Sequence, residues 1–323
     1  MKDGMVIKMI QNTCKTCEEL LLEFKEKDFK DNSSKIKFDL GEKDARDIYN
    51  ITAAFRWNGE TIIGGRVEAR DSEDSEVVFF KQEEDGVFRP RKGYPTYRLQ
   101  DPFFTVIQEE IVIGGVEIYD DPLKPGTLAY RTIFLRGNSL DSLKRFATGP
   151  ERMKEIRLLE LAEDKILVFT RPQGEVGGRG TIGYTIISSL EELGVETIEK
   201  AVLFDKQFIK EEWGGANELH LLKNGLVGVL SHIAKFDEQG DRHYYSSTFA
   251  FNVETGEYTP MKLIAIRANF ADGSYKRIDL LDVIFSGGLV REENGKAKLY
   301  CGVSDAEAHV ITIEDPFLEY ENK

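Results

Sequence analysis

Residues 51–67 read ITAAFRWNGETIIGGRV, and this pattern returns four more times along the chain. Two runs rich in β-branched and aromatic residues flank Asn58-Gly59, which is typical of a β-hairpin with a two-residue turn. The later copies are residues 103–118 (FFTVIQEEIVIGGVEI), 156–172 (IRLLELAEDKILVFTRP), 219–233 (LHLLKNGLVGVLSHI) and 283–303 (VIFSGGLVREENGKAKLYCGV). The five turns centre on Asn58, Glu109, Glu163, Asn224 and Asn294, about 50 to 70 residues apart.

Further strand-like segments lie between the hairpins, such as residues 76–82 (EVVFFKQ) and 247–256 (STFAFNVETG). Each repeat therefore holds about four strands, and the sequence lacks the long helices that a parallel α/β fold would need. We predict an all-β fold, a five-bladed β-propeller, in a single domain covering residues 1–323. Residues 1–45 are expected to form a short amphipathic helix, at Thr16–Asp31, and a lead-in strand. A pair of β-sandwiches is the structural alternative.

The composition limits the classes of partner. With 323 residues, 41% hydrophobic and 31% charged, the chain is typical of a globular protein. Its net charge of −14 argues against binding to nucleic acid or to an anionic membrane surface. The sequence shows neither a membrane-spanning run nor a signal peptide, so a cytoplasmic location is expected. The pair Cys14 and Cys17 lacks the further ligands that a zinc site requires, and no metal is expected.

Polar residues recur at similar distances from the predicted turns, and equal positions in successive repeats of a propeller face one another across its axis. Asn50, Asp101, Lys154 and Asn217 lie seven to nine residues before their turns, and Arg66, Glu117, Arg171 and His232 lie eight residues after theirs. The fifth repeat departs from this count, because its nearest polar residue is Asp305; a bulge within residues 301–305 would bring it to the same depth. We predict that these side chains gather in one pocket, where buried charges are paired or meet a ligand.

Other motifs are less informative. The glycine-rich residues 175–180 are followed by neither a helix nor a Lys-Ser/Thr pair, so they are read as a flexible loop and not as a phosphate-binding loop. The motifs of common serine hydrolases and zinc proteases are missing. The basic and aromatic residues 242–245 (RHYY) favour a sugar or phosphate contact over nucleic acid in so acidic a chain.

The order of short motifs resembles that of the five-bladed mannoside phosphorylases, glycoside hydrolase family 130. The similar segments are Asn50, residues 65–68 (GRVE), 98–102 (RLQDP), 169–172 (FTRP), 231–232 (SH), 285–288 (FSGG) and 302–305 (GVSD). Residues 98–103 (RLQDPF) and the WGGANE segment at 213–218 resemble more closely the β-1,2-mannan transferases and phosphorylases of glycosyltransferase family 108.

The resemblance implies roles for individual residues. Asp101 would be the general acid, and Asn50, Arg66 and Asp305 would hold the mannosyl unit. Arg171 and His232, with Lys154 and Tyr245, would bind phosphate. Glu117 and Glu218 complete the predicted substrate-binding set. Gln100 and Phe103 replace an acid and an arginine that are common in the family.

The residue set favours phosphorolysis on chemical grounds. An inverting hydrolase needs two carboxylates, one of which activates water, whereas phosphate is already an anionic nucleophile and needs cations to hold it. We therefore predict an inverting enzyme that converts a β-mannoside and phosphate to α-mannose 1-phosphate, and the reverse, with phosphate as co-substrate and no cofactor. A hydrolase using Glu117, Glu218 or Asp305 as base, and a non-catalytic carbohydrate-binding propeller, are the alternatives. Linkage, acceptor length, use of a sugar-nucleotide donor and oligomeric state stay open, and a homo-oligomer is allowed.

Overall fold

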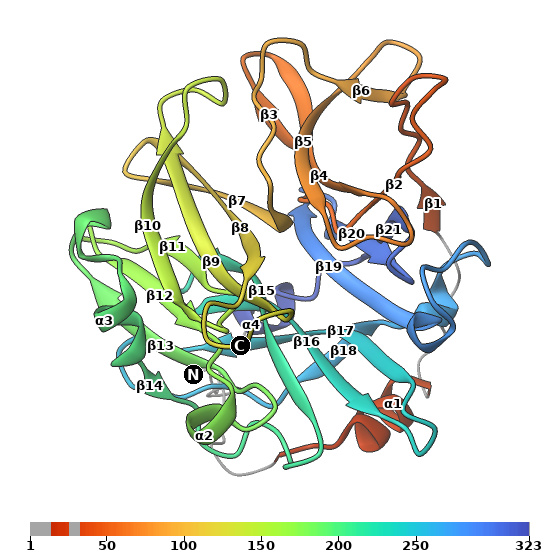
Figure 1. Ribbon diagram of the computed structural model, residues 1–323. Helices are drawn as coiled ribbons and strands as arrows, with labels where there is room; N and C mark the ends of the chain where they lie inside the picture. The colour runs from red at the N-terminus through yellow and green to blue at the C-terminus, as the bar shows by residue number, and fades with distance from the viewer. Residues whose placement is uncertain (1–13, 26–32, 323) are drawn as a thin grey trace.

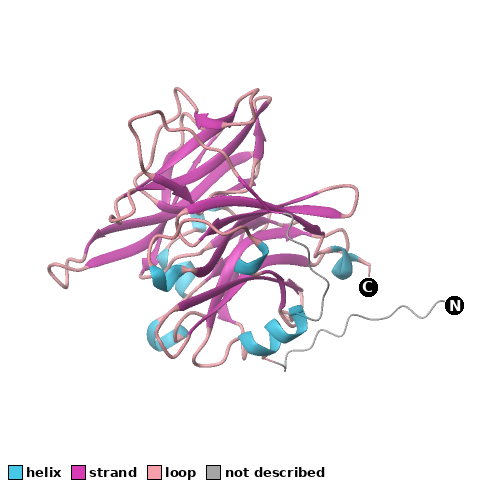
Figure 2. Cartoon of the chain, turned by 90° about the vertical axis from the view of Figure 1, so that its right-hand side faces the viewer, coloured by secondary structure: helices cyan, strands magenta, loops and turns pink. Residues whose placement is uncertain are grey.

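The computed structural model describes residues 14–25 and 33–322, and these residues form mainly antiparallel β-sheets. Figures 1 and 2 show strands throughout the molecule and only short helices at its surface. The prediction of an all-β fold is confirmed at this level. No helix in the described parts of the chain is long and apolar enough to span a membrane.

The first two sheets are formed by residues 47–151. The first sheet has the order β2-β4-β5-β6, with β3 paired to β4, and its strands are β2 (Asp47–Tyr49), β3 (Phe55–Trp57), β4 (Glu60–Glu68), β5 (Ser75–Gln82) and β6 (Phe88–Pro90). The second sheet has the order β7-β8-β9-β10, and its strands are β7 (Gln100–Ile107), β8 (Glu110–Asp120), β9 (Leu128–Gly137) and β10 (Lys144–Glu151).

The third sheet is a similar four-stranded unit, with strands β11 (Arg157–Glu160), β12 (Ile166–Thr170), β13 (Gly183–Ile187) and β14 (Val202–Leu203). The remaining strands form one eight-stranded sheet, because a short parallel pairing of β17 with β19 joins two antiparallel groups. The first group comprises β15 (Trp213–Leu221), β16 (Val227–Phe236), β17 (Arg242–Phe251) and β18 (Lys262–Ala265). The second comprises β19 (Asp282–Arg291), β20 (Lys296–Val303), β21 (Glu307–Glu314) and, from the other end of the chain, β1 (Ser33–Lys35).

All five predicted hairpins are present. They connect β3 to β4, β7 to β8, β11 to β12, β15 to β16 and β19 to β20. At the first turn both Asn58 and Gly59 have positive φ, and the same holds for the pairs Gln108-Glu109 and Glu163-Asp164. Two consecutive residues in this region define the turn that suits the twist of paired strands, so the local turn chemistry positions each hairpin.

Five hydrophobic clusters fill the spaces between successive units. One joins the first and second sheets, another the second and third, and a third the third sheet to β16 and β17. A fourth cluster joins β16 and β17 to β19–β21, and the fifth packs β4 and β5 against Ala308 of β21. Residues from the two ends of the chain are therefore neighbours in the core (Figure 1).

Helix α1 (Cys17–Lys25) confirms the predicted N-terminal helix, although the predicted end at Asp31 lies outside the described residues. Thr16 and Glu19 form a reciprocal cap at its start: Thr16 N donates to the Glu19 carboxylate at 2.8 Å, and Glu19 N donates to Thr16 Oγ1 at 3.2 Å. Leu20 and Phe24 then bury one face of the helix in the core.

The other helices are short: α2 (Gly174–Gly177), α3 (Val195–Glu199) and α4 (Leu318–Glu321), with 3₁₀ turns at Leu190–Glu192, Arg267–Asn269 and Ile278–Leu280. Helix α2 lies in the stretch that we expected to be a flexible loop.

Gly287 of β19 packs closely against the backbone of Ile51, near the other end of the chain. A Cβ built at Gly287 would lie 1.6 Å from the carbonyl oxygen of Ile51. We expect Gly287→Ala to lower the free energy of unfolding by about 2 to 3 kcal/mol, since backbone must move to admit the methyl group. Gly194→Ala is the control, because Gly194 has extended backbone and no atom within 4 Å of the built Cβ. Urea denaturation measures both, and equal losses would contradict the close packing.

Candidate active site

Asp101 lies at the start of β7, where three sheets meet, and it is held by residues of the first sheet. Its Oδ1 accepts hydrogen bonds from Asn50 Nδ2 at 2.8 Å and from Arg66 Nη1 at 3.1 Å. The Asp101 and Arg66 side chains are only 11% and 6% exposed. The predicted proximity of Asn50, Arg66 and Asp101 is therefore confirmed, while their roles stay predictions.

The backbone at these positions is strained. Asn50 (φ 43°), Asp101 (φ 48°) and Asp305 (φ 49°) are all left-handed, a region that residues other than glycine rarely adopt. Such conformations cost free energy, persist only where the surroundings impose them and cluster at functional sites. The three residues form, with Arg66, what we call the carboxylate cluster.

Asp305 reaches this cluster by a different route from the predicted bulge. Strand β20 pairs with β21 without a register shift, and Asp305 lies in the turn that follows β20. The irregularity of this hairpin is instead in β19, between Ser286 and Gly288. The bulge expected within residues 301–305 was therefore wrong, and the left-handed turn supplies the extra reach.

The two carboxyl groups of the cluster have opposite pKa shifts. Burial would raise the pKa of Asp101, but the charges of Arg66 and Lys154 and the hydrogen bond from Asn50 outweigh it and hold the pKa below its usual value. Burial raises the pKa of Asp305, and the negative charge of Asp101 adds to this, against the opposing charge of Arg66. In the ligand-free protein Asp305 is thus the more readily protonated of the two.

A cationic cavity of about 480 Å³ lies beside the cluster. Gln100, which precedes Asp101, is part of its wall. The residues that give the cavity its character are Lys154, Arg171, Arg179, Trp213, Arg242 and Tyr244. Lys154 connects the two regions, because it lines the cavity and its charge lowers the pKa of both Asp101 and Asp305.

Arg171 is the most deeply buried of these cations, with 2% of its side chain exposed. Its Nε donates to the carbonyl oxygen of Gly214 at 2.8 Å and lies 3.0 Å from Glu155 Oε2, whereas its buried Nη1 has no hydrogen-bond partner among the described residues. Gly215 lacks a side chain for a clear reason, since a Cβ would lie 2.0 Å from Glu155 Oε2. The guanidinium is fixed in place and keeps unused donor capacity beside the cavity.

His232 lies behind this ion pair and is fully buried. Asn217 Nδ2 donates to the carbonyl oxygen of Ser286, so its Oδ1 is left to accept from His232 Nδ1 at 2.9 Å. The Nε2 atom lies 3.5 Å from the Glu155 carboxylate. Burial lowers the pKa of His232 to about 4, against the opposing effect of Glu155. His232 is therefore a neutral residue that packs behind the ion pair of Glu155 and Arg171, and it is not among the residues that line the cavity.

Three predicted site residues lie elsewhere. Glu117 is paired with Arg131 and Arg145 of its own sheet. Glu218 accepts from the backbone N of Leu289 at 2.7 Å and pairs with His220. Tyr245 packs in the core, and its hydroxyl donates to Asp282 at 3.1 Å.

Tyr244, one residue before Tyr245, faces the cavity, where its hydroxyl accepts from Trp213 Nε1 at 3.0 Å. Side chains alternate between the faces of a strand, so the two neighbouring tyrosines point to opposite faces and Tyr245, which the resemblance implied, points into the core. Glu155 was also missed in the sequence analysis. This residue lies between β10 and β11 with a left-handed backbone (φ 61°), so it follows no strand periodicity, and only its neighbour Lys154 pointed to this region. No group of His, Cys, Asp and Glu suited to a metal ion occurs among the described residues.

Comparison with known proteins places this chain in a family. Residues 23–319 match the family model described as a protein of unknown function, DUF1861. The chain belongs to the DUF1861 family.

Solved relatives of this DUF1861 protein cover nearly all of it. A mannose phosphorylase from Leishmania mexicana, solved with a phosphate ion, is 32% identical with a TM-score of 0.85 over 94% of both chains. A GDP-Man-dependent mannosyltransferase from the same organism is 31% identical with a TM-score of 0.83, over 94% of this chain and 95% of the other. A 4-O-β-D-mannosyl-D-glucose phosphorylase from Bacteroides fragilis is 26% identical over 287 residues, 80% of this chain and 71% of that protein. The predicted resemblance to mannoside phosphorylases is confirmed.

The surroundings of His232 predict its protonation state. We expect it to stay neutral, with the proton on Nδ1, from about pH 5.5 to 8, because burial lowers its pKa to about 4. His243 provides an internal contrast: burial opposes its charge, but hydrogen bonds to Asp282 and Asp237 raise its pKa above the usual value. Long-range ¹H–¹⁵N NMR of the imidazole rings distinguishes the states. A doubly protonated His232 at pH 6.5 would contradict this assignment.

Proposed function

We propose that this protein is an inverting β-mannoside phosphorylase that also runs in the synthetic direction. The observation that carries the proposal is the position of Lys154, which lines the cationic cavity and acts electrostatically on both carboxyl groups of the cluster. A sugar held at the cluster and an anion held in the cavity would thus be neighbours. The relatives that act on mannosides or bind phosphate support this reading.

In the proposed reaction Asn50, Arg66 and Asp305 hold the mannosyl unit, and phosphate binds between Lys154 and Arg171. A phosphate oxygen attacks the anomeric carbon as the bond to the glycosidic oxygen breaks, and Asp101 gives its proton to that oxygen. Attack from the face opposite the leaving sugar converts the β-mannoside to α-mannose 1-phosphate. In the reverse direction Asp101 takes the proton back from the acceptor hydroxyl.

Phosphate binding would prepare Asp101 for this role. In the empty site the charges of Arg66 and Lys154 help to hold its pKa below the usual value of a carboxyl group. A bound phosphate places negative charge beside Lys154, and a neighbouring negative charge favours the protonated form of a carboxyl group. Protonation of Asp101 is thereby coupled to the binding of phosphate, the nucleophile.

Hydrolysis is less well supported. Two of the three candidate bases, Glu117 and Glu218, are already occupied by Arg131 and Arg145 and by the Leu289 backbone. Asp305, the third, has a pKa raised by burial and by the negative charge of Asp101, and in the proposed reaction it holds the mannosyl unit.

A sugar-nucleotide donor is the second candidate for synthesis. Beyond Lys154 and Arg171 the cavity continues to Arg179, which has no ion-pair partner in the described residues and lies over the rings of Trp213 and Phe236. Cations beside aromatic rings suit a diphosphate and a nucleotide base. The mannosyltransferase relative, described as GDP-Man-dependent, supports including this donor in the assay.

We also propose that the chain closes into a five-bladed propeller. The hydrophobic clusters link each hairpin unit to the next and the last unit to the first, and β1 completes the sheet of β19–β21. The solved relatives of lower identity, such as a β-1,2-mannobiose phosphorylase from Listeria innocua (12% identical, TM-score 0.62, 91% of this chain and 94% of the other), support the same fold. A cytoplasmic location is part of the proposal.

The direct test is a product assay with β-1,2-mannobiose and 4-O-β-D-mannosyl-D-glucose, with and without phosphate, followed by mass spectrometry. We expect mannose 1-phosphate only with phosphate, and a drop of about 10²- to 10⁴-fold in kcat for Asp101→Asn, the usual size of a general-acid contribution. GDP-mannose with a mannoside acceptor is tested in parallel. Mannose released at equal rates without phosphate would contradict phosphorolysis.

The anion site is tested separately. We expect Arg171→Met to raise the KM for phosphate by at least about tenfold while leaving the KM for the mannoside nearly unchanged, because a charge-assisted contact is lost on one substrate only. Arg89→Met is the control, since Arg89 forms surface ion pairs with Asp39 and Asp85. Equal changes in both KM values would argue against a dedicated phosphate ligand.

A further inference from the structure

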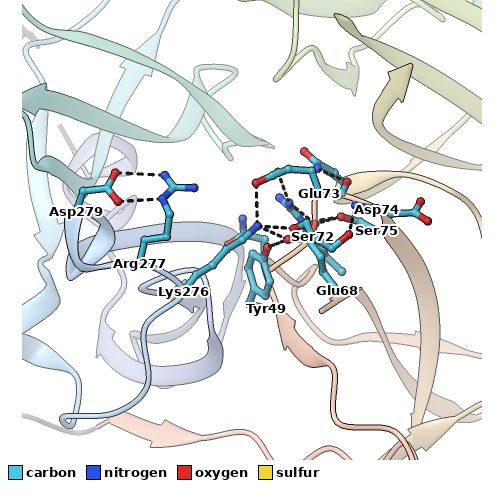
Figure 3. Close-up of polar contacts among 12 residues, drawn as sticks. Tyr49, Glu68, Ser72, Glu73, Asp74, Ser75, Lys276, Arg277 and Asp279 are labelled. Atoms are coloured by element: carbon cyan, nitrogen blue, oxygen red, sulfur yellow. Dashed lines mark hydrogen bonds and ion pairs between the residues drawn. The ribbon is translucent and has the colours of Figure 1, made fainter. Parts of the chain in front are cut away.

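Lys276 is a buried cation that reaches from the segment before β19 to the first sheet (Figure 3). Its ammonium group donates to the Glu68 carboxylate, to the carbonyl oxygen of Ser72 at 3.0 Å and to Glu73 Oε1 at 3.0 Å. Only 6% of its side chain is exposed. All three ammonium protons therefore have acceptors. These acceptors belong to β4 of the first sheet or to the loop between β4 and β5.

Glu68, at the end of β4, is the group on which these contacts converge. Its side chain is fully buried. Oε1 accepts from Lys276 and from Tyr49 Oη at 2.7 Å, and Oε2 accepts from Ser75 and from two nitrogens of Arg66. A carboxylate with this many donors is fixed in position and in charge.

Arg66 connects Glu68 to the carboxylate cluster. Its Nε and Nη2 bind Glu68 at 3.1 and 2.6 Å, which leaves Nη1 to bind Asp101 at 3.1 Å. Glu68 provides the shortest of the contacts that orient the guanidinium on this side. The others are the 3.1 Å contact to Ser75, the 3.5 Å contact to Glu73 and the Tyr49 ring, whose centroid lies 4.8 Å from the guanidinium carbon.

Lys276 is also tied to the turn that carries Asp305. Its backbone N donates to the carbonyl oxygen of Ser304 at 3.0 Å. The Ser304 hydroxyl accepts from Arg267 Nε at 3.1 Å and donates to the carbonyl oxygen of Leu281 at 2.9 Å. One residue thus holds both sides of the carboxylate cluster, Arg66 through its side chain and Asp305 through its backbone.

We propose that Lys276 is a positioning residue of the mannosyl site: it holds Glu68, and through Glu68 the guanidinium of Arg66, against Asp101, and it fixes the turn of Asp305. This inference rests on the proposed function and adds a residue that touches neither Asp101 nor the cavity. The segment from Arg267 to Leu281, between β18 and β19, positions Lys276 beside the first sheet.

The charges around Lys276 explain why its own charge matters. Glu68, Tyr49 and Arg66 face it from the first sheet, Glu73 from the following loop and Asp305 from the turn after β20. On the far side of its segment, Glu307 accepts from Ser274 N and pairs with Lys35 and His309. The charge of Lys276 lowers the pKa of Asp305, and its hydrogen bond lowers the pKa of Glu68. Removing it therefore raises the proton affinity of the cluster.

Lys276→Met tests the proposal, with Lys276→Arg as the conservative variant. We expect Lys276→Met to lower kcat by at least about tenfold, because Arg66 loses its fixed orientation toward the reacting groups. We also expect the basic limb of the pH profile of kcat/KM to move to higher pH. Arg66 helps to hold the pKa of Asp101 below its usual value, and that effect weakens when the guanidinium is no longer held against Asp101. Lys276→Arg should restore the position of the limb.

The charge-matched control is Arg70→Met, which removes a half-exposed cation that binds Asp47 at the edge of the same sheet. The proposal would be overturned if Lys276→Met kept the wild-type kcat and the wild-type pH profile. It would also be overturned if Lys276→Met and Arg70→Met changed both quantities equally. If the wild-type protein forms no mannose 1-phosphate, the proposed function fails. Carbon-13 NMR of the aspartate carboxyl groups, assigned with Asp305→Asn, then still tests the inference: Asp305 must titrate at higher pH in Lys276→Met, and an unchanged titration contradicts it.

Discussion

The ionic contacts of Arg66 are the constraint on which the site depends. A buried carboxylate such as Asp101 is costly unless a cation and hydrogen bonds compensate it, and Arg66 and Asn50 supply both from the first sheet. Glu68 in turn compensates Arg66, and Lys276 and Tyr49 complete the shell of Glu68. These contacts join residues of the first sheet to Asp101 of the second and to Lys276 before β19, so the site is complete only when these parts of the chain are packed together.

The site combines two kinds of environment that have different tasks. The carboxylate cluster is nearly closed and strained in its backbone, and Asp101 is held against Arg66, which suits the fixed orientation of a sugar. The cavity is open and cationic, and Arg171 keeps a donor without a partner among the described residues. In a protein of net charge −14, such local positive charge is needed to attract an anion at all. Lys154 lines the cavity and lowers the pKa of Asp101, so an anion bound beside Lys154 would change the pKa of Asp101.

Much of the architecture follows from local sequence signals. The turn residues and flanking apolar runs located all five hairpins, because hairpin turns impose strict backbone chemistry. Equal distances from those turns brought Asn50, Arg66, Asp101, Lys154 and Arg171 to the correct region. Equal distances did not locate every residue, because Glu117 pairs with Arg131 and Arg145 of its own sheet and His232 lies behind the ion pair of Arg171 and Glu155. The motif resemblance pointed to Tyr245, whereas its neighbour Tyr244 lines the cavity. Lys276 and Glu155 lie outside any strand pattern, and only tertiary structure reveals them.

The central claim is that a sugar at the carboxylate cluster and an anion at Lys154 and Arg171 occupy one continuous site. A crystal structure of the Asp101→Asn variant with a β-mannoside and phosphate tests it most directly. We expect phosphate in contact with both Lys154 and Arg171, on the face of the mannosyl ring opposite the leaving sugar, with residue 101 beside the glycosidic oxygen. Phosphate bound only near Arg179 and Arg242, or a sugar outside the cluster, would contradict it.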